Sequence, residues 1–324
     1  MHNDQKLRRI IVDTDTGSDD VWAIIEALRA TDIVRVEAIT VVYGNFPLDL
    51  CVKNAMLAVD AAGTYVPPVY RGMERPLLNP ETFYAPEVHG ADGLGGMDLP
   101  MPERPVETKH AVDTIIDLVM AAPGEIEIVT CGPLTNLALA IQKEPRLAGS
   151  IKKAWILGGA AGGIGNMTPK AEFNIYADQE AADIVLRSGV EATWVTWDSA
   201  VGETEITRED VTKLLTCGDG AGAFCALCTR QLREYYRRTQ GRDTYAVIDA
   251  LVMTAALYPE VMERPFRTNC SIELAAGELR GYFRMDDNSP PNAIVCPAVK
   301  AAVFKEKLFS LLGAGQEIRR EYHE

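Results

Sequence analysis

The apolar positions of the chain repeat with two different periods. Short runs rich in Ile and Val are typical of buried strands, and segments with apolar residues three or four positions apart are typical of helices. The two patterns follow one another up to about residue 196. Strands are predicted at residues 9–13, 36–42, 125–130, 153–157 and 191–196, and helices at 21–30, 54–62, 134–142 and 180–187.

This alternation of strands and helices, joined by short loops, predicts an α/β fold with a mostly parallel central sheet flanked by helices. The later part of the chain is less regular and contains neither an internal repeat nor a low-complexity linker. A single domain covering 1–324 is therefore predicted. The later elements are expected as helices at 221–238, 245–257 and 298–312 and an antiparallel region near 272–283.

The composition agrees with a soluble globular protein, because 47% of the residues are hydrophobic and 24% are charged. The 46 acidic and 32 basic residues give a net charge of −14, which argues against nucleic acid as a partner and favours metal cations. The first apolar run, residues 10–12, is too short for a signal peptide or a membrane span. A cytoplasmic protein without a membrane partner is expected.

Cysteine usage indicates buried thiols. The chain has seven cysteines, an odd number, and no spacing typical of a disulfide framework. Cys225 and Cys228 form a C-x-x-C pair, but no second Cys or His pair lies near them, so a zinc site is not favoured.

The first candidate site is an acidic loop that follows the first predicted strand. Ligands of parallel sheets gather at the carboxyl ends of the strands. Clustered carboxylates raise each other's pKa or bind a hard cation. Capping of the next helix would stabilise each charge by only about 0.3 to 1 kcal/mol, which does not account for the whole cluster. The loop contains Asp13, Asp15, Asp19 and Asp20.

The spacing of this loop excludes one kind of site and leaves another open. An EF-hand that begins at Asp13 would need glycine and glutamate where the chain has Ser18 and Ile24. A haloacid-dehalogenase-like phosphatase also begins with a strand and an Asp-x-Asp loop, and it would use Asp13 as a phosphoryl-accepting nucleophile with magnesium. The phosphatase is therefore an alternative.

Six further motifs follow the acidic loop in order. They are Gly-Asn at 44–45, His-Gly at 89–90, Thr-Cys-Gly-Pro-Leu-Thr-Asn at 130–136, Gly-Asn at 165–166, Ala-Glu-Phe-Asn at 171–174, and Asp249 in a late helix. Together with the loop, this order resembles the inosine-uridine-preferring nucleoside hydrolases and related ribonucleoside N-ribohydrolases. The resemblance covers nearly the whole chain and implies a Rossmann-like nucleoside hydrolase fold.

The resemblance implies a calcium site formed by Asp15, Asp20, the backbone carbonyl of Thr130, and Asp249. Carboxylate and carbonyl oxygens suit a hard cation, and water and two ribose hydroxyls would complete its coordination. Asp249 also supports this interpretation by itself, because its neighbours in the predicted helix are apolar and an unpaired carboxylate there would be costly.

The resemblance further implies a ribose site. Asn residues often serve turns, and Glu172 alone would pass as a surface residue. A polar segment with two Asn and one Glu, however, offers the donors and acceptors that a sugar requires. The residues expected around the substrate are Asp19, Asn45, Asn166, Glu172, Asn174 and Asp249.

The expected reaction is hydrolysis of the N-glycosidic bond through an oxocarbenium-like transition state, with Asp15 as general base. Several family members carry a His before the late aspartate, where this chain has Ile248. His89, in a glycine-rich loop, is the candidate replacement for this acid. Aromatic stacking on the base is another option, with candidates Phe83, Tyr84, Tyr235, Tyr236 and Tyr245.

The sequence thus predicts calcium-dependent cleavage of ribonucleosides to ribose and free base, in nucleoside catabolism or purine salvage. The alternatives are the phosphatase and a ribose- or nucleoside-binding protein without turnover, which Ile248 would explain. The resemblance implies a homodimer or homotetramer as the assembly.

Overall fold

The computed structural model describes residues 7–216 and 219–313. Its centre is one sheet in the order β3-β2-β1-β4-β5-β6-β9-β7-β8. The pairs from β3 to β9 are parallel, and β7 runs antiparallel to both β9 and β8. The prediction of a mostly parallel α/β sheet is therefore confirmed. The strands are β1 (Arg8–Thr14), β2 (Val34–Val41), β3 (Val69–Arg71), β4 (Ile126–Thr130), β5 (Lys153–Leu157), β6 (Ala192–Val195), β7 (Phe266–Ile272), β8 (Phe283–Asp286) and β9 (Ala293–Cys296).

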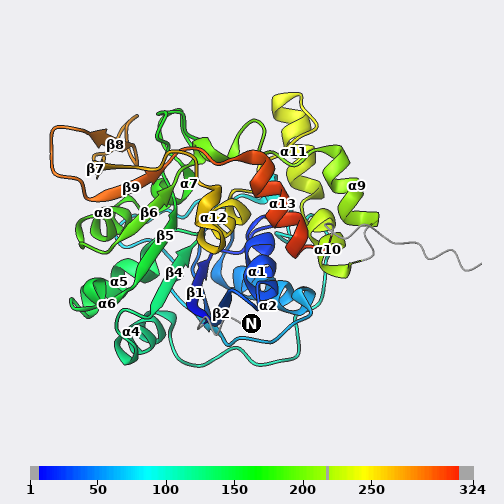
Figure 1. The fold of residues 1–324 in the computed structure, drawn as a ribbon, viewed down its shortest axis with the longest axis horizontal. Coiled ribbons are helices and arrows are strands. Elements are labelled where there is room, and N and C mark those ends of the chain that lie inside the picture. The colour runs from blue at the N-terminus through cyan, green and yellow to red at the C-terminus, as the bar shows by residue number, and fades with distance from the viewer. Residues whose placement is uncertain (1–6, 217–218, 314–324) are drawn as a thin grey trace, which may run out of the picture.

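Helices cover both faces of the sheet, and each face has its own hydrophobic core (Figure 1). No helix in the described ranges is long and apolar enough to cross a bilayer. The predicted domain range, 1–324, includes residues that lie outside the described ranges. The prediction that the chain has no signal peptide also concerns residues at its start that lie outside these ranges. One face carries α1 (Asp20–Arg29), α2 (Leu48–Ala62), α10 (Gly220–Cys228), α12 (Ile248–Leu257) and α13 (Ala301–Leu311), and the other carries α4 (Ala111–Ala121), α5 (Thr135–Lys143), α6 (Leu147–Ser150) and α8 (Gln179–Arg187).

Two predicted helices differ from the structure for identifiable reasons. The helix expected over 221–238 is divided at Thr229, whose hydroxyl donates to the carbonyl of Cys225 at 2.8 Å, and α11 (Arg230–Gln240) follows. The helix expected from 245 begins at Ile248, because Tyr245 forms a β-bridge with Ile206. The sequence analysis missed β3, α4 and α9 (Arg208–Thr216).

A buried ion pair ties β1 to β4 at the edge of the sheet opposite to the strands' carboxyl ends. Glu127 is 3% exposed and accepts hydrogen bonds from Arg8 Nε and Trp155 Nε1, both at 3.0 Å. Burial alone would raise the pKa of Glu127, but these donors outweigh it and lower the pKa to about 2.

Glu127→Gln is therefore expected to lower the free energy of unfolding by about 2 kcal/mol at pH 7, because charge-assisted hydrogen bonds are lost. A depressed carboxyl pKa stabilises the fold above the unfolded value of 4.5, and this stabilisation disappears as the pH falls toward 2. The difference in free energy of unfolding between wild type and variant should therefore decrease as the pH falls from 4.5 toward 2. Urea unfolding at pH 7 and pH 3 measures it, with the exposed Glu306→Gln as control. A gap of the same size at both pH values would contradict the assignment.

Candidate active site

Asp13, the first aspartate of the acidic loop, connects neighbouring elements by hydrogen bonds. Asp13 is 2% exposed, and both of its carboxylate oxygens accept from Asn136 Nδ2, at 3.2 and 3.1 Å. Thr40 Oγ1 donates to Oδ2 at 3.2 Å. Burial raises the pKa of Asp13 to about 7. Asp13 therefore links β1, β2 and α5, and it is not the free nucleophile that the phosphatase alternative requires.

Asp15 and Asp20 are fully buried and do not line the cavity, but Asp20 lies beside Cys131 and Asp249, which do. The Asn45 backbone N–H donates to Asp15 Oδ2 at 2.7 Å, and the Asn45 amide donates to Asp20 Oδ2 at 3.3 Å. Thr14 Oγ1 donates to Asp20 Oδ1 at 2.6 Å. The approach is close enough that a Cβ on Gly44 would lie 2.0 Å from Asp15 Oδ2. A glycine is thus required at position 44, in the turn that follows β2, because this turn packs directly against Asp15.

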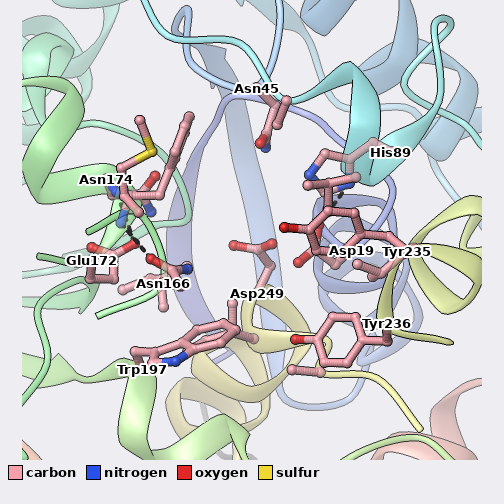
Figure 2. A pocket seen from close by; sticks show the side chains of 18 of the residues that line it. Asp19, Asn45, His89, Asn166, Glu172, Asn174, Trp197, Tyr235, Tyr236 and Asp249 are labelled. Carbon is pink, nitrogen blue, oxygen red and sulfur yellow. Dashed lines mark hydrogen bonds and ion pairs between the residues drawn. The ribbon is translucent and has the colours of Figure 1, made fainter. Parts of the chain in front are cut away.

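Asp249 comes to the same place from the first turn of α12. Burial, then the charges of Asp20 and Asp19, raise its pKa well above the usual range. Among the described residues, Asp15 Oδ1, Asp19 Oδ1 and Asp249 Oδ1 are buried oxygens without a hydrogen-bond partner. Crowded and partnerless carboxylates are costly in a protein interior unless a cation neutralises them. Figure 2 shows Asp249 in the middle of the cavity, between two groups of polar residues.

The turn after β4 presents Cys131 to this cluster. Atoms of Asp20, Cys131 and Asp249 that could bind a metal lie within 4.8 Å of one another. Cys131 lines the cavity, and its carbonyl accepts from Asn174 Nδ2 at 2.8 Å. Thr130, the residue expected from the sequence, is the last residue of β4 and does not line the cavity. Asp15 and Asp20 are likewise outside the cavity lining, so the backbone carbonyl of Thr130 stays a predicted metal ligand.

The cavity measures about 650 Å³ and has polar groups on one side of Asp249. Glu172 caps α7 (Phe173–Ala177) by accepting from the N–H groups of Asn174 at 2.8 Å and Ile175 at 3.2 Å. Burial raises the pKa of Glu172 to about 7. Asn166 Oδ1 accepts from the Phe173 N–H at 2.9 Å. The three predicted sugar-binding residues of this segment therefore lie together (Figure 2).

His89 lies on the other side of Asp249, next to Asp19 (Figure 2). Ser18 contacts its Nδ1 through the backbone N–H at 3.3 Å and through Oγ at 2.8 Å, and the N–H contact favours the tautomer with the proton on Nε2. Asp19 Oδ1 lies 3.6 Å from the same Nδ1. Burial lowers the pKa of His89 to about 4, so the ring is neutral at pH 7. A neutral ring can donate a hydrogen bond but cannot act as a charged acid.

Three of the five aromatic candidates, Tyr84, Tyr235 and Tyr236, line the cavity. The expectation for the other two is wrong. Phe83 packs against Tyr176 with ring centroids 5.2 Å apart, and Tyr245 is fully buried. The sequence analysis missed further cavity-lining residues, including Trp197, Met167 and Phe173. Trp197 follows β6, so the rule about strand ends could have found it. Met167 and Phe173 flank residues of the polar segment.

The family model of the inosine-uridine preferring nucleoside hydrolases matches residues 10–306. The chain belongs to this family. It is therefore a nucleoside hydrolase, and the phosphatase alternative is wrong. The probable uridine nucleosidase 2 of Oryza sativa subsp. japonica is 36% identical to this nucleoside hydrolase over 280 residues, which are 86% of this chain and 82% of the relative.

Solved nucleoside hydrolases share the whole fold. A plant nucleoside hydrolase has a TM-score of 0.88 and 30% identity, over 95% of this chain and 99% of the other. The purine-preferring ribonucleoside hydrolase from Gardnerella vaginalis also has a TM-score of 0.88, with 28% identity over 95% and 99% of the two chains. The names of two of these relatives give different bases, uridine for the rice relative and purines for the Gardnerella vaginalis enzyme. Membership of the family therefore does not by itself identify the preferred base.

Proposed function

We propose that this nucleoside hydrolase cleaves ribonucleosides to ribose and free base with a calcium ion as cofactor. The observation that carries the proposal is the meeting of Asp15, Asp19 and Asp249, each with a buried oxygen that lacks a partner, beside a cavity with polar side chains. A hard cation satisfies such oxygens, and a ribose diol can complete its coordination.

The residues fit a calcium ion. Asp15, Asp20 and Asp249 would supply carboxylate oxygens, and the turn after β4 would supply a carbonyl. The resemblance assigns that carbonyl to Thr130, which directly precedes Cys131, whereas the Cys131 carbonyl already accepts from Asn174 Nδ2. When bound, the ion would lower the pKa of a water molecule and orient two ribose hydroxyls.

Asp15 would act as general base. Its Oδ2 is held by the Asn45 N–H, while its Oδ1 has no partner and can accept the proton of the attacking water. The water oxygen bonds to C1′, and the electron pair of the C1′–N bond leaves with the base. Asp19 and Asp249 would stabilise the positive charge that develops on the ribose ring.

The remaining polar residues would bind the ribose. Asn166, Glu172 and Asn174 form one group at the end of the cavity away from His89, where they suit the 5′ hydroxyl. Asn45 would contribute indirectly to substrate binding, because it donates hydrogen bonds that hold Asp15 and Asp20 in place. His89, neutral and protonated on Nε2, would donate a hydrogen bond into the cavity and would not protonate the base as a charged acid.

Removal of calcium is expected to lower uridine and inosine hydrolysis by a factor of about 10² or more, because stabilisation of the transition state by the ion is lost. The measurement is release of free base with and without a chelator, followed by addition of calcium. 2′-Deoxyuridine is the matched substrate, and we expect its kcat/KM to be about 10³-fold lower, because the diol is incomplete.

Two results would contradict the proposal. Activity that survives thorough chelation would exclude the metal. Tight ribose binding without base release from any ribonucleoside, with calcium present, would favour the binding protein without turnover. A homodimer or homotetramer stays a prediction that light scattering can test.

A further inference from the structure

One cation lies at the wall of a cavity that is otherwise acidic. Among the described residues that line the cavity, Arg242 is the one Lys or Arg, and the lining also includes the carboxylates of Asp19, Glu172 and Asp249. An arginine side chain stays charged at any pH at which the protein is folded. The cavity therefore has a positive group in an otherwise negative surface.

Arg242 is held in place by its own contacts. Its Nη1 forms an ion pair at 2.6 Å with Glu205, whose side chain is only 3% exposed. Its Nε donates to Gln240 Oε1 at 2.9 Å, and its guanidinium carbon lies 5.2 Å from the centre of the Tyr236 ring. Its Nη2 also donates to Gln240 Oε1, so one N–H each on Nη1 and Nη2 remains for a ligand, and the side chain is 39% exposed.

The loop that carries Arg242 is fixed directly after it, at Asp243 and Tyr245. Arg233 on α11 donates to both carboxylate oxygens of Asp243, at 2.7 and 2.6 Å. Tyr245 and Ile206 exchange backbone hydrogen bonds at 2.8 and 3.2 Å. The guanidinium is therefore positioned before a ligand arrives, which is the condition under which a charge stabilises a transition state efficiently.

The cation and the proposed ribose site lie on opposite sides of Asp249. Figure 2 shows Tyr236 on the side of His89 and Asp19, away from Glu172 and Asn166, with its hydroxyl toward the middle of the cavity. Because Arg242 stacks on Tyr236, it belongs to the same side. A nucleoside with its ribose among the carboxylates and carboxamides would have its base on this side.

A positive group on that side would make bond cleavage easier. When the C1′–N bond breaks, its electron pair moves to the base, and the negative charge spreads onto the carbonyl oxygens of the ring. Ile248 also lines the cavity and cannot donate a proton. A guanidinium can stabilise the departing anion by hydrogen bonds without giving up a proton, and the base takes its proton from solvent water afterwards.

We propose that Arg242 contacts the carbonyl oxygens of the leaving base, stabilises its negative charge, and makes the enzyme selective for bases that carry such oxygens, such as uracil and hypoxanthine, over adenine. Adenine presents an exocyclic amino group where hypoxanthine presents an oxygen, and two donors facing each other form no hydrogen bond. This proposal rests on the hydrolase function proposed above. Glu205 acts as the positioning residue for Arg242.

The test is Arg242→Gln, assayed at saturating calcium with uridine, inosine, adenosine and p-nitrophenyl riboside. Nitrophenolate is stable as an anion and needs no help to leave. We expect kcat/KM for uridine and inosine to fall by about 10- to 100-fold, because a charge-assisted hydrogen bond is lost. Adenosine and p-nitrophenyl riboside should fall much less, so the ratio of uridine to p-nitrophenyl riboside decreases about 10-fold or more.

The control is Arg238→Gln, which removes an arginine from an exposed position on α11, the helix that precedes the loop of Arg242, and is expected to leave all four values unchanged. An equal loss for every substrate would mean that Arg242 is structural and would overturn the proposal. The proposal would also be overturned if the ratio of kcat/KM for uridine to that for p-nitrophenyl riboside did not change in the variant. It would likewise be overturned if the wild type preferred adenosine to inosine. Each of these results leaves the hydrolase function intact, whereas absence of hydrolysis of any riboside by wild type would overturn both.

Discussion

Asp15→Asn is expected to lower kcat for uridine hydrolysis by a factor of about 10³, with the fold intact, because a positioned general base contributes about 10²- to 10⁴-fold. The amide is nearly the same size as the carboxylate. Its oxygen can still accept the Asn45 N–H that now donates to Asp15 Oδ2. What disappears is the oxygen that can take a proton from water.

This result is measured as kcat at saturating calcium, together with circular dichroism and the midpoint of thermal unfolding. Asp117→Asn is the control, since Asp117 is exposed on α4 and its ion pair with Lys109 lies at the surface. Retained activity in Asp15→Asn would count against Asp15 as the base. If calcium no longer raised the unfolding midpoint of the variant, the loss would instead reflect a missing metal ligand.

Asp249→Asn is expected to stabilise the calcium-free protein and to abolish its response to calcium. Burial, with the charges of Asp20 and Asp19, raises the pKa of Asp249 in the folded state well above its ordinary value of 3.8. A carboxyl group with a raised pKa binds more protons folded than unfolded, so its contribution to stability falls as the pH rises above about 4. Asparagine removes that cost, because it carries no charge.

We expect the midpoint of calcium-free Asp249→Asn to exceed that of wild type by about 2 °C or more at pH 7, and the difference to vanish near pH 4. Calcium at about 100 times its Kd should stabilise wild type by about 2.7 kcal/mol and the variant hardly at all. Uridine hydrolysis by the variant should fall by a factor of about 10³. A calcium-free variant that melts below wild type would mean that Asp249 is not held beside other carboxylates at a cost.

The matched control is Asp178→Asn. Asp178 is also a buried carboxylate with a raised pKa, but its oxygens accept from Thr135 Oγ1 at 2.6 Å and from the Ala181 N–H at 3.1 Å. Loss of these bonds is expected to destabilise the protein with or without calcium. Stability of the calcium-free protein is thus expected to rise in Asp249→Asn and to fall in Asp178→Asn. This difference distinguishes a carboxylate that binds a cation from one that caps a helix.

Local patterns in the sequence determined the alternation of strands and helices and the position of the acidic loop after β1. Both could be predicted because the period of apolar residues depends on near neighbours, and because a loop that follows a parallel strand lies at the carboxyl edge of the sheet. The family motifs added Asp249 and the segment from Asn166 to Asn174. These residues do lie around one cavity.

Only the tertiary structure decided which individual atoms face one another. It separated Asp13, which is bound by Thr40 and Asn136, from Asp15 and Asp20, although all three belong to one motif. It placed Cys131 in the cavity wall, with Thr130, Asp15 and Asp20 outside the lining. It also turned Nδ1 of His89 toward Ser18 and set Arg242 between Glu205 and Tyr236. Such contacts join residues that are far apart in the chain, so no local spacing encodes them and they depend on how the helices and loops pack around the sheet.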